Sequence, residues 1–192
     1  MKKIILLLVL LLSVQVAKAR VDTLMVDVFF RPQSTDVIFS YLNNGRNIQA
    51  FVDSVKRIHL QYPEKKLTFE IESGCFICTS FYQGRKLGEE RGVAVRNFLS
   101  KLLHDFEPDF KVNCTIFNQG VRWGKLYSMI KESNEPWKDE VLSVLASSVD
   151  TDETEEDPRF AKLRKLRGGK VLGDLADNYL LLLEEVVIYL IY

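Results

Sequence analysis

The run Val186–Tyr192, VVIYLIY, constrains the fold more than any other stretch of the sequence. All of its residues are apolar or aromatic and several are β-branched, which is typical of a strand buried on both faces. An exposed strand of this kind would promote aggregation, because its backbone could pair with another chain. We therefore expect this run to be paired inside a sheet, so that it belongs to the core.

Residues 67–99 predict a strand, a loop and a helix in succession. Apolar and polar residues alternate from Leu67 to Glu72, the period of a half-buried strand. A loop of small and polar residues follows, and apolar residues then recur at helical spacing from Leu87 to Leu102. We expect any binding site to lie in the loop between this strand and this helix.

Further strands are predicted at Val21–Phe30 and Phe110–Phe117, and a further helix at Asn47–Leu60. Residues 21–117 then have the order β-α-β-α-β, in which each crossover helix can cover the sheet. Short helices are predicted downstream, around Trp123–Ile130, from Pro136 onward and over Val171–Leu183. A further short helix is predicted to begin at Pro158, with Asp157 as its N-cap, and to end at Gly168-Gly169. The predicted class is α/β, a two-layer β-α-β-α-β sandwich with a helical insertion over 117–185 and a final strand in the sheet.

The N-terminal residues have the pattern of a secretory signal peptide. Lys2 and Lys3 precede the apolar run Ile4–Leu12, and Ala17-Lys18-Ala19 provides a small-residue cleavage site. We therefore predict a signal peptide at 1–19 and one exported domain at 20–192, in the periplasm or at the outer membrane. Nothing after the signal is long and apolar enough to span a bilayer as a helix.

The composition excludes some classes of function. Hydrophobic residues make up 47% and charged residues 27% of the chain, which are globular values, and the formal net charge is zero. A balanced charge gives no indication of nucleic-acid binding. The acidic run Ser147–Asp157 is interpreted as a solvated loop that leads into a helix cap, in preference to a metal site.

Four motifs carry a resemblance to a known family. The first predicted strand ends in Phe30-Arg31-Pro32-Gln33-Ser34, and the last third of the chain contains Trp123–Leu126, the turn Leu166–Gly169 and the aliphatic run Val186–Tyr192. With this element order, the chain resembles the OmpA-like domain, the periplasmic peptidoglycan-binding module of outer-membrane protein A and its relatives. The resemblance covers most of residues 24–117. It is closest to divergent members from Gram-negative anaerobes, which are often encoded near surface-fimbria genes.

The resemblance implies a ligand site at the start of the second helix. In the family, an Arg and an Asp hold the two ends of diaminopimelate, the cross-linking residue of the peptidoglycan peptide. Aligned on the helix, Arg91 takes the Arg position, Leu87 a Leu position and Gly84 an Asn position, whereas Phe76 falls where the family has its Asp. Loss of one charged partner weakens such a site by tens-fold or more. Glu72 could replace the anion only if the loop is reshaped.

The cysteines offer an alternative chemistry. Cys75-Phe76-Ile77-Cys78 follows a strand, as the C-x-x-C of thioredoxin-like proteins does, so a periplasmic thiol-disulfide oxidoreductase is the alternative function. The helix is predicted to begin near Gly84, too late to stabilise a thiolate at Cys75. A structural disulfide is the simpler expectation, and Cys75, Cys78 and Cys114 allow three single bridges.

No catalytic constellation is predicted elsewhere. The sequence has no G-x-S-x-G, phosphate loop or H-E-x-x-H motif, and His59 and His104 stand apart from the cysteine loop. We therefore expect a non-catalytic cell-envelope protein without a cofactor or metal. Its expected partner is peptidoglycan, bound weakly, or an envelope or fimbrial protein.

Overall fold

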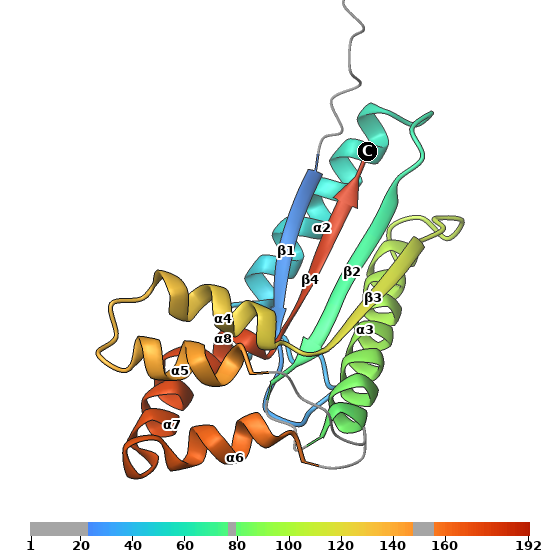
Figure 1. Ribbon diagram of the computed structural model, residues 1–192. Helices are drawn as coiled ribbons and strands as arrows, with labels where there is room; N and C mark the ends of the chain where they lie inside the picture. The colour runs from blue at the N-terminus through green and yellow to red at the C-terminus, as the bar shows by residue number, and fades with distance from the viewer. Residues whose placement is uncertain (1–22, 77–79, 148–155) are drawn as a thin grey trace, which may run out of the picture.

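The computed structural model describes residues 23–76, 80–147 and 156–192, so the predicted signal peptide lies outside the described residues. Four strands form one mixed sheet in the order β1-β4-β2-β3 (Figure 1). Their bounds are β1 Thr23–Phe29, β2 Thr68–Cys75, β3 Asn113–Val121 and β4 Glu185–Ile191. The predicted α/β two-layer class is therefore confirmed, with a β-α-β-α-β start and the last strand inside the sheet.

Strand β4 lies between β1 and β2 and runs antiparallel to both. Val26 of β1 and Ile71 of β2 both pair with Ile188, so side chains of one parity share a face across the three strands. Val186, Ile188 and Leu190 are at most 2% exposed. The run Val186–Tyr192 is thus confirmed as a strand inside the sheet, with alternate side chains in the core. Tyr189 and Ile191 lie on the opposite face and are partly exposed, so burial on both faces is not complete.

One face of the sheet is covered by two long helices, α2 (Asn44–Gln61) and α3 (Phe81–His104). Figure 1 shows both helices behind the sheet. Helix α2 packs on β1, whereas α3 packs on β2 and β3. The main core lies between the two layers and is built from Val28, Phe69, Ile71 and Ile188 of the strands together with Phe51, Val55, Val95 and Leu99 of the helices.

A group of shorter helices between β3 and β4 has a core of its own. It comprises α4 (Trp123–Glu132), α5 (Lys138–Leu145), α6 (Pro158–Lys165), the 3₁₀ turn η1 (Leu166–Gly169), α7 (Lys170–Leu175), the π-helical turn η2 (Ala176–Leu180) and α8 (Leu181–Leu183). These helices bury a second apolar cluster at one end of the sheet, with Leu126, Ile130, Leu163 and Leu175 fully enclosed (Figure 1).

Several predicted boundaries needed correction. Helix α3 begins at Phe81, three residues before the predicted Gly84. The Ser80 hydroxyl caps the helix by accepting a hydrogen bond from the backbone N–H of Gln83. Strand β3 begins at Asn113 and continues to Val121, so the helical insertion starts at Trp123 and not at 117. Helix α5 begins two residues after Pro136.

The caps of α6 agree with the sequence. The Asp157 carboxylate accepts from the backbone N–H of Arg159 and Pro158 occupies the first turn, as predicted. Gly168 and Gly169 adopt positive φ values of 66° and 92°, the left-handed conformation that ends a helix. Residues 148–155 of the predicted acidic loop lie outside the described residues. In the described part of the chain, no helix combines the length and apolarity needed to cross a membrane.

Candidate functional site

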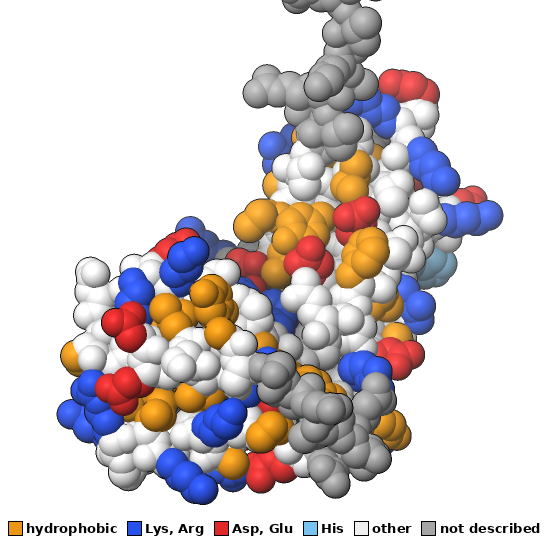
Figure 2. All heavy atoms as spheres, in the orientation of Figure 1, with side chains coloured by type: hydrophobic (Ala, Val, Ile, Leu, Met, Phe, Trp, Pro, Cys, Tyr) orange, Lys and Arg blue, Asp and Glu red, His pale blue; other side chains and the backbone are white. Residues whose placement is uncertain are grey.

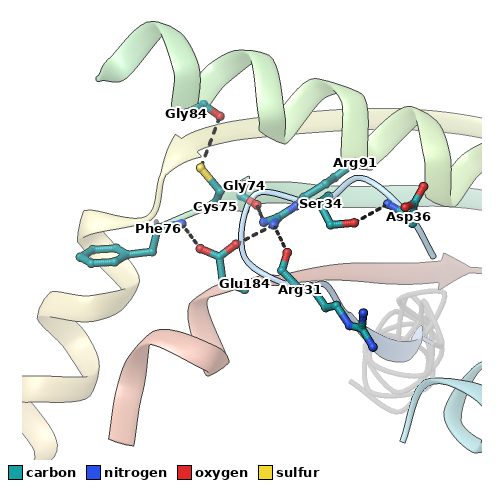
Figure 3. A network of polar contacts seen from close by, with 9 residues as sticks. All are labelled: Arg31, Ser34, Asp36, Gly74, Cys75, Phe76, Gly84, Arg91 and Glu184. Atoms are coloured by element: carbon teal, nitrogen blue, oxygen red, sulfur yellow. Dashed lines mark hydrogen bonds and ion pairs between the residues drawn. The ribbon is translucent and has the colours of Figure 1, made fainter. Parts of the chain in front are cut away.

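Arg91 lies at the centre of the candidate site and is fully buried, with 0% of its surface exposed. Its guanidinium donates to three backbone carbonyls: to Ser34 O at 2.9 Å from Nε, to Gly74 O at 3.1 Å and to Arg31 O at 3.1 Å (Figure 3). Helix α3 therefore ties the loop after β1 to the end of β2. The Phe30–Ser34 motif thus contributes two of the carbonyls that hold the Arg91 side chain.

A carboxylate from the end of the helical insertion completes the site. Glu184 Oε2 lies 2.6 Å from Arg91 Nη2, and both side chains are 0% exposed. The other oxygen, Oε1, accepts from the backbone N–H of Phe76 at 2.7 Å (Figure 3). The anion that pairs with Arg91 is therefore supplied by the chain itself, immediately before β4. The alternative anion, Glu72, points to the opposite face of the sheet, where it accepts from Gln119.

Phe76 is also inside the protein, with 1% of its surface exposed. Its ring packs edge-on against the rings of Trp123 and Phe160, with ring centroids 4.9 Å and 5.4 Å apart, respectively. Phe76 therefore anchors the helical insertion to the end of β2. Phe81 is partly buried against the same cluster, Tyr82 is 53% exposed, and Ile77 lies outside the described residues.

The other two predicted site residues also have structural roles. Gly84 is buried in the first turn of α3, and Leu87 is half-buried against the second core. Further along, a Cβ on Gly92 would come within 2.6 Å of the Ile116 side chain. One on Gly88 would lie 2.4 Å from Asn118 Oδ1 and 3.2 Å from Gly74 Cα. These glycines let α3 lie close to β2 and β3, which brings Arg91 within reach of Glu184.

A second buried ion pair lies beside the first. Arg122, just after β3, is 3% exposed and donates to the carbonyl of Glu72 at 3.1 Å and to Glu185 Oε1 at 3.4 Å. Lys125 of α4 also pairs with Glu185. Burial lowers the pKa of Arg122, and the charges of Glu185 and Glu72 oppose that shift. Neighbouring glutamates at the start of β4 thus bind cations from different elements.

The cysteine predictions have separate outcomes. Cys75 pairs with Val121 in the sheet, whereas Cys114 lies opposite Phe69, six residues earlier on β2. At about 3.3 Å per residue the two cysteines are about 20 Å apart, so a Cys75–Cys114 disulfide is excluded. Cys78 lies outside the described residues. Cys75 is fully buried, with Sγ 3.8 Å from the carbonyl oxygen of Gly84 (Figure 3), which does not favour a reactive thiol at this position.

Sequence reasoning missed Glu184 and Arg122. Both are charged residues next to an apolar or aromatic stretch, and Glu184-Glu185 directly precedes the buried run Val186–Tyr192. A carboxylate that directly precedes a buried strand needs a cationic partner, and this requirement could have identified Glu184 from the sequence. Within the described ranges, no three His, Cys, Asp or Glu side chains are grouped to hold a metal ion.

No family model matches the chain, and no curated protein matches it either.

Proposed function

We propose that the protein is a non-catalytic interaction module of the cell envelope with an OmpA-like architecture, and that it acts by binding a protein partner. The order of its elements, the strand order β1-β4-β2-β3 and the predicted signal peptide support this proposal. So does the position of Arg91 in the third turn of α3, the helix that follows β2, since the resemblance implies a ligand-binding cation on this helix.

The observation that carries the choice of partner is the Arg91–Glu184 pair. A cell-wall carboxylate would have to displace Glu184 from a guanidinium that is 0% exposed and already donates to three carbonyls. Displacement would leave Glu184 buried without its cation, which costs several kcal/mol. Phe76 further disfavours a charged ligand, because a charged group bound beside it would lose its hydration within an aromatic cluster. This geometry favours a structural role for Arg91.

Sedimentation with purified peptidoglycan tests the proposal. We expect the mature protein to stay in the supernatant, at concentrations where a peptidoglycan-binding OmpA-like domain pellets completely. Co-sedimentation that free diaminopimelate competes away would contradict the proposal and return Arg91 to a ligand role.

A variant without the ion pair serves as the matched control. Arg91→Ala alone leaves Glu184 buried and unpaired, so loss of binding in that variant could reflect unfolding. The double variant Arg91→Met/Glu184→Leu removes both charges and keeps the volume filled. If wild type pelleted and this folded double variant did not, peptidoglycan binding through Arg91 would be established.

A further inference from the structure

The face of the sheet opposite α2 and α3 carries an unusual combination of side chains. In the described residues no helix packs across it, and Figure 1 shows this face toward the viewer. Met25 is 60% exposed and Phe117 is 46% exposed, and Tyr189 and Ile191 are partly exposed between them. The register aligns Met25 with Tyr189 and Glu70 in one row, and Asp27 with Val187, Glu72 and Phe117 in the next.

The charges on this face, which we call the open face, are all of one sign. Its outward positions include four carboxylates, Asp27, Glu70, Glu72 and Glu185, and no lysine or arginine. The positions are Thr23, Met25, Asp27 and Phe29 of β1, Thr68, Glu70 and Glu72 of β2, Asn113, Thr115 and Phe117 of β3, and Glu185, Val187, Tyr189 and Ile191 of β4. None of the first three carboxylates forms an ion pair with a described residue, whereas Glu185 at the end of the face binds Arg122 and Lys125. In Figure 2 acidic side chains alternate with apolar ones over the sheet.

The side chains of the open face indicate which kind of partner could bind there. Exposed apolar side chains favour contact with other apolar groups, while neighbouring carboxylates repel anions and attract cations. Burial raises the pKa of Tyr189, the charges of Glu72, Asp27 and Glu185 add to this shift, and the charge of Arg122 opposes it. A second copy docked through the same face would bring carboxylates against carboxylates, which disfavours a symmetric dimer.

We propose that the open face binds a cationic, amphipathic segment of a partner protein, with lysine or arginine side chains beside Asp27, Glu70 and Glu72 and aliphatic side chains against Met25, Tyr189 and Phe117. The hollow along α3 and the hollow near His59 are lined by none of the side chains named in this proposal. Alternating apolar and acidic side chains along neighbouring strands suit an extended or helical segment better than a small molecule. This inference rests on the proposed function, because it names the partner chemistry of the same module.

The probe is a short fluorescent peptide in which lysine alternates with valine, and its matched control replaces each lysine with glutamate. Binding to the folded mature protein is followed by anisotropy at low and at physiological salt. We expect the lysine peptide to bind, the glutamate peptide not to bind, and the affinity to fall as salt increases.

Variants locate the binding on the open face. The triple variant Asp27→Asn/Glu70→Gln/Glu72→Gln should bind the lysine peptide about tenfold more weakly, and Met25→Glu should weaken the apolar contribution. The matched control is Glu89→Gln/Glu90→Gln, which removes exposed carboxylates from α3 on the covered side. It should leave the affinity unchanged, and all variants should keep wild-type unfolding midpoints.

Each other result overturns the inference. No binding of the lysine peptide, equal binding of both peptides, or equal loss in the α3 control would reject the open face as a cation-selective surface. Dimerisation that Met25→Glu abolishes would assign the face to a second copy. These outcomes leave the peptidoglycan result unaffected, so failure of this inference is distinguishable from failure of the proposed function.

Discussion

The two faces of the sheet differ in whether their charged side chains are buried and paired. On the covered face the candidate ligand-binding cation, Arg91, is enclosed and paired with Glu184. On the open face Asp27 and Glu70 form no ion pair with a described residue, and the Glu72 carboxylate interacts with the buried Arg122 only through its charge. The neighbouring glutamates Glu184 and Glu185 are paired with Arg91 and with Arg122 and Lys125, respectively. Under our proposals, Arg91 is neutralised inside the protein and the partner binds on the other face of the same sheet.

The largest expected effect comes from breaking the buried pair. Arg91→Ala or Glu184→Ala should each lower the free energy of unfolding by about 3–5 kcal/mol, because each leaves an uncompensated buried charge. Arg91→Met/Glu184→Leu should recover most of that loss. Urea denaturation of the three variants measures the effect. Single variants within about 1 kcal/mol of wild type would mean that the pair is open to solvent.

A second comparison places neighbouring residues of β2 on the two faces. Ile71→Ala should cost about 3 kcal/mol, since Ile71 is 0% exposed in the main core. Glu70→Ala, one position earlier on the open face, should change the stability by no more than about 0.5 kcal/mol. Thermal unfolding of both variants checks the prediction. Equal losses would show that the open face is covered.

The close approach of α3 to the sheet predicts a smaller change in stability, opposite in sign to that of a control glycine on α7. Gly92→Ala should destabilise the protein by about 1–3 kcal/mol, because the new Cβ would meet Ile116 Cγ2 at 2.6 Å. Gly173→Ala is the matched control on α7, where a Cβ meets nothing within 4 Å, and it should stabilise by up to about 1 kcal/mol. The same sign for both changes, measured by denaturation, would contradict the packing described for α3.

The smallest expected effect concerns Cys114 on β3, at the covered side. Burial raises the pKa of its thiol, and the nearby Arg96 opposes the shift only in part. The folded protein then holds the thiol protonated at a pH where the unfolded chain ionises it, so alkylation should be slower in the folded state. Iodoacetamide labelling near pH 8.5, with and without urea and mapped by mass spectrometry, measures the difference. Faster labelling of the folded protein would refute the burial of Cys114.

Local patterns explain how much of the fold was predictable. Alternation identified β1 and β2, the run Val186–Tyr192 identified a strand that proves to be central, and Asp157-Pro158 identified the start of α6. These features depend on neighbours in sequence. The start of α3 was placed too late because the apolar spacing was weighted above the N-cap signal of Ser80.

The site was less predictable because its members meet only in three dimensions. Arg91 and Phe76 were predicted from the sequence as ligand-binding residues, whereas Glu184, which contacts both, lies at the far end of a helical insertion. No sequence spacing relates these positions. The open face was equally hidden, since its outward residues form rows only once the register of four strands is known.

The most direct test follows the Arg91 side chain itself. Its Nε–Hε group donates to Ser34 O inside the protein, so its NMR signal should be protected from solvent exchange. We predict that titration of the mature protein with diaminopimelate or with soluble peptidoglycan fragments leaves this signal unmoved. A saturable shift of the Arg91 signal, together with loss of ligand binding in the folded variant Arg91→Met/Glu184→Leu, would show that ligand displaces Glu184 and would contradict the account.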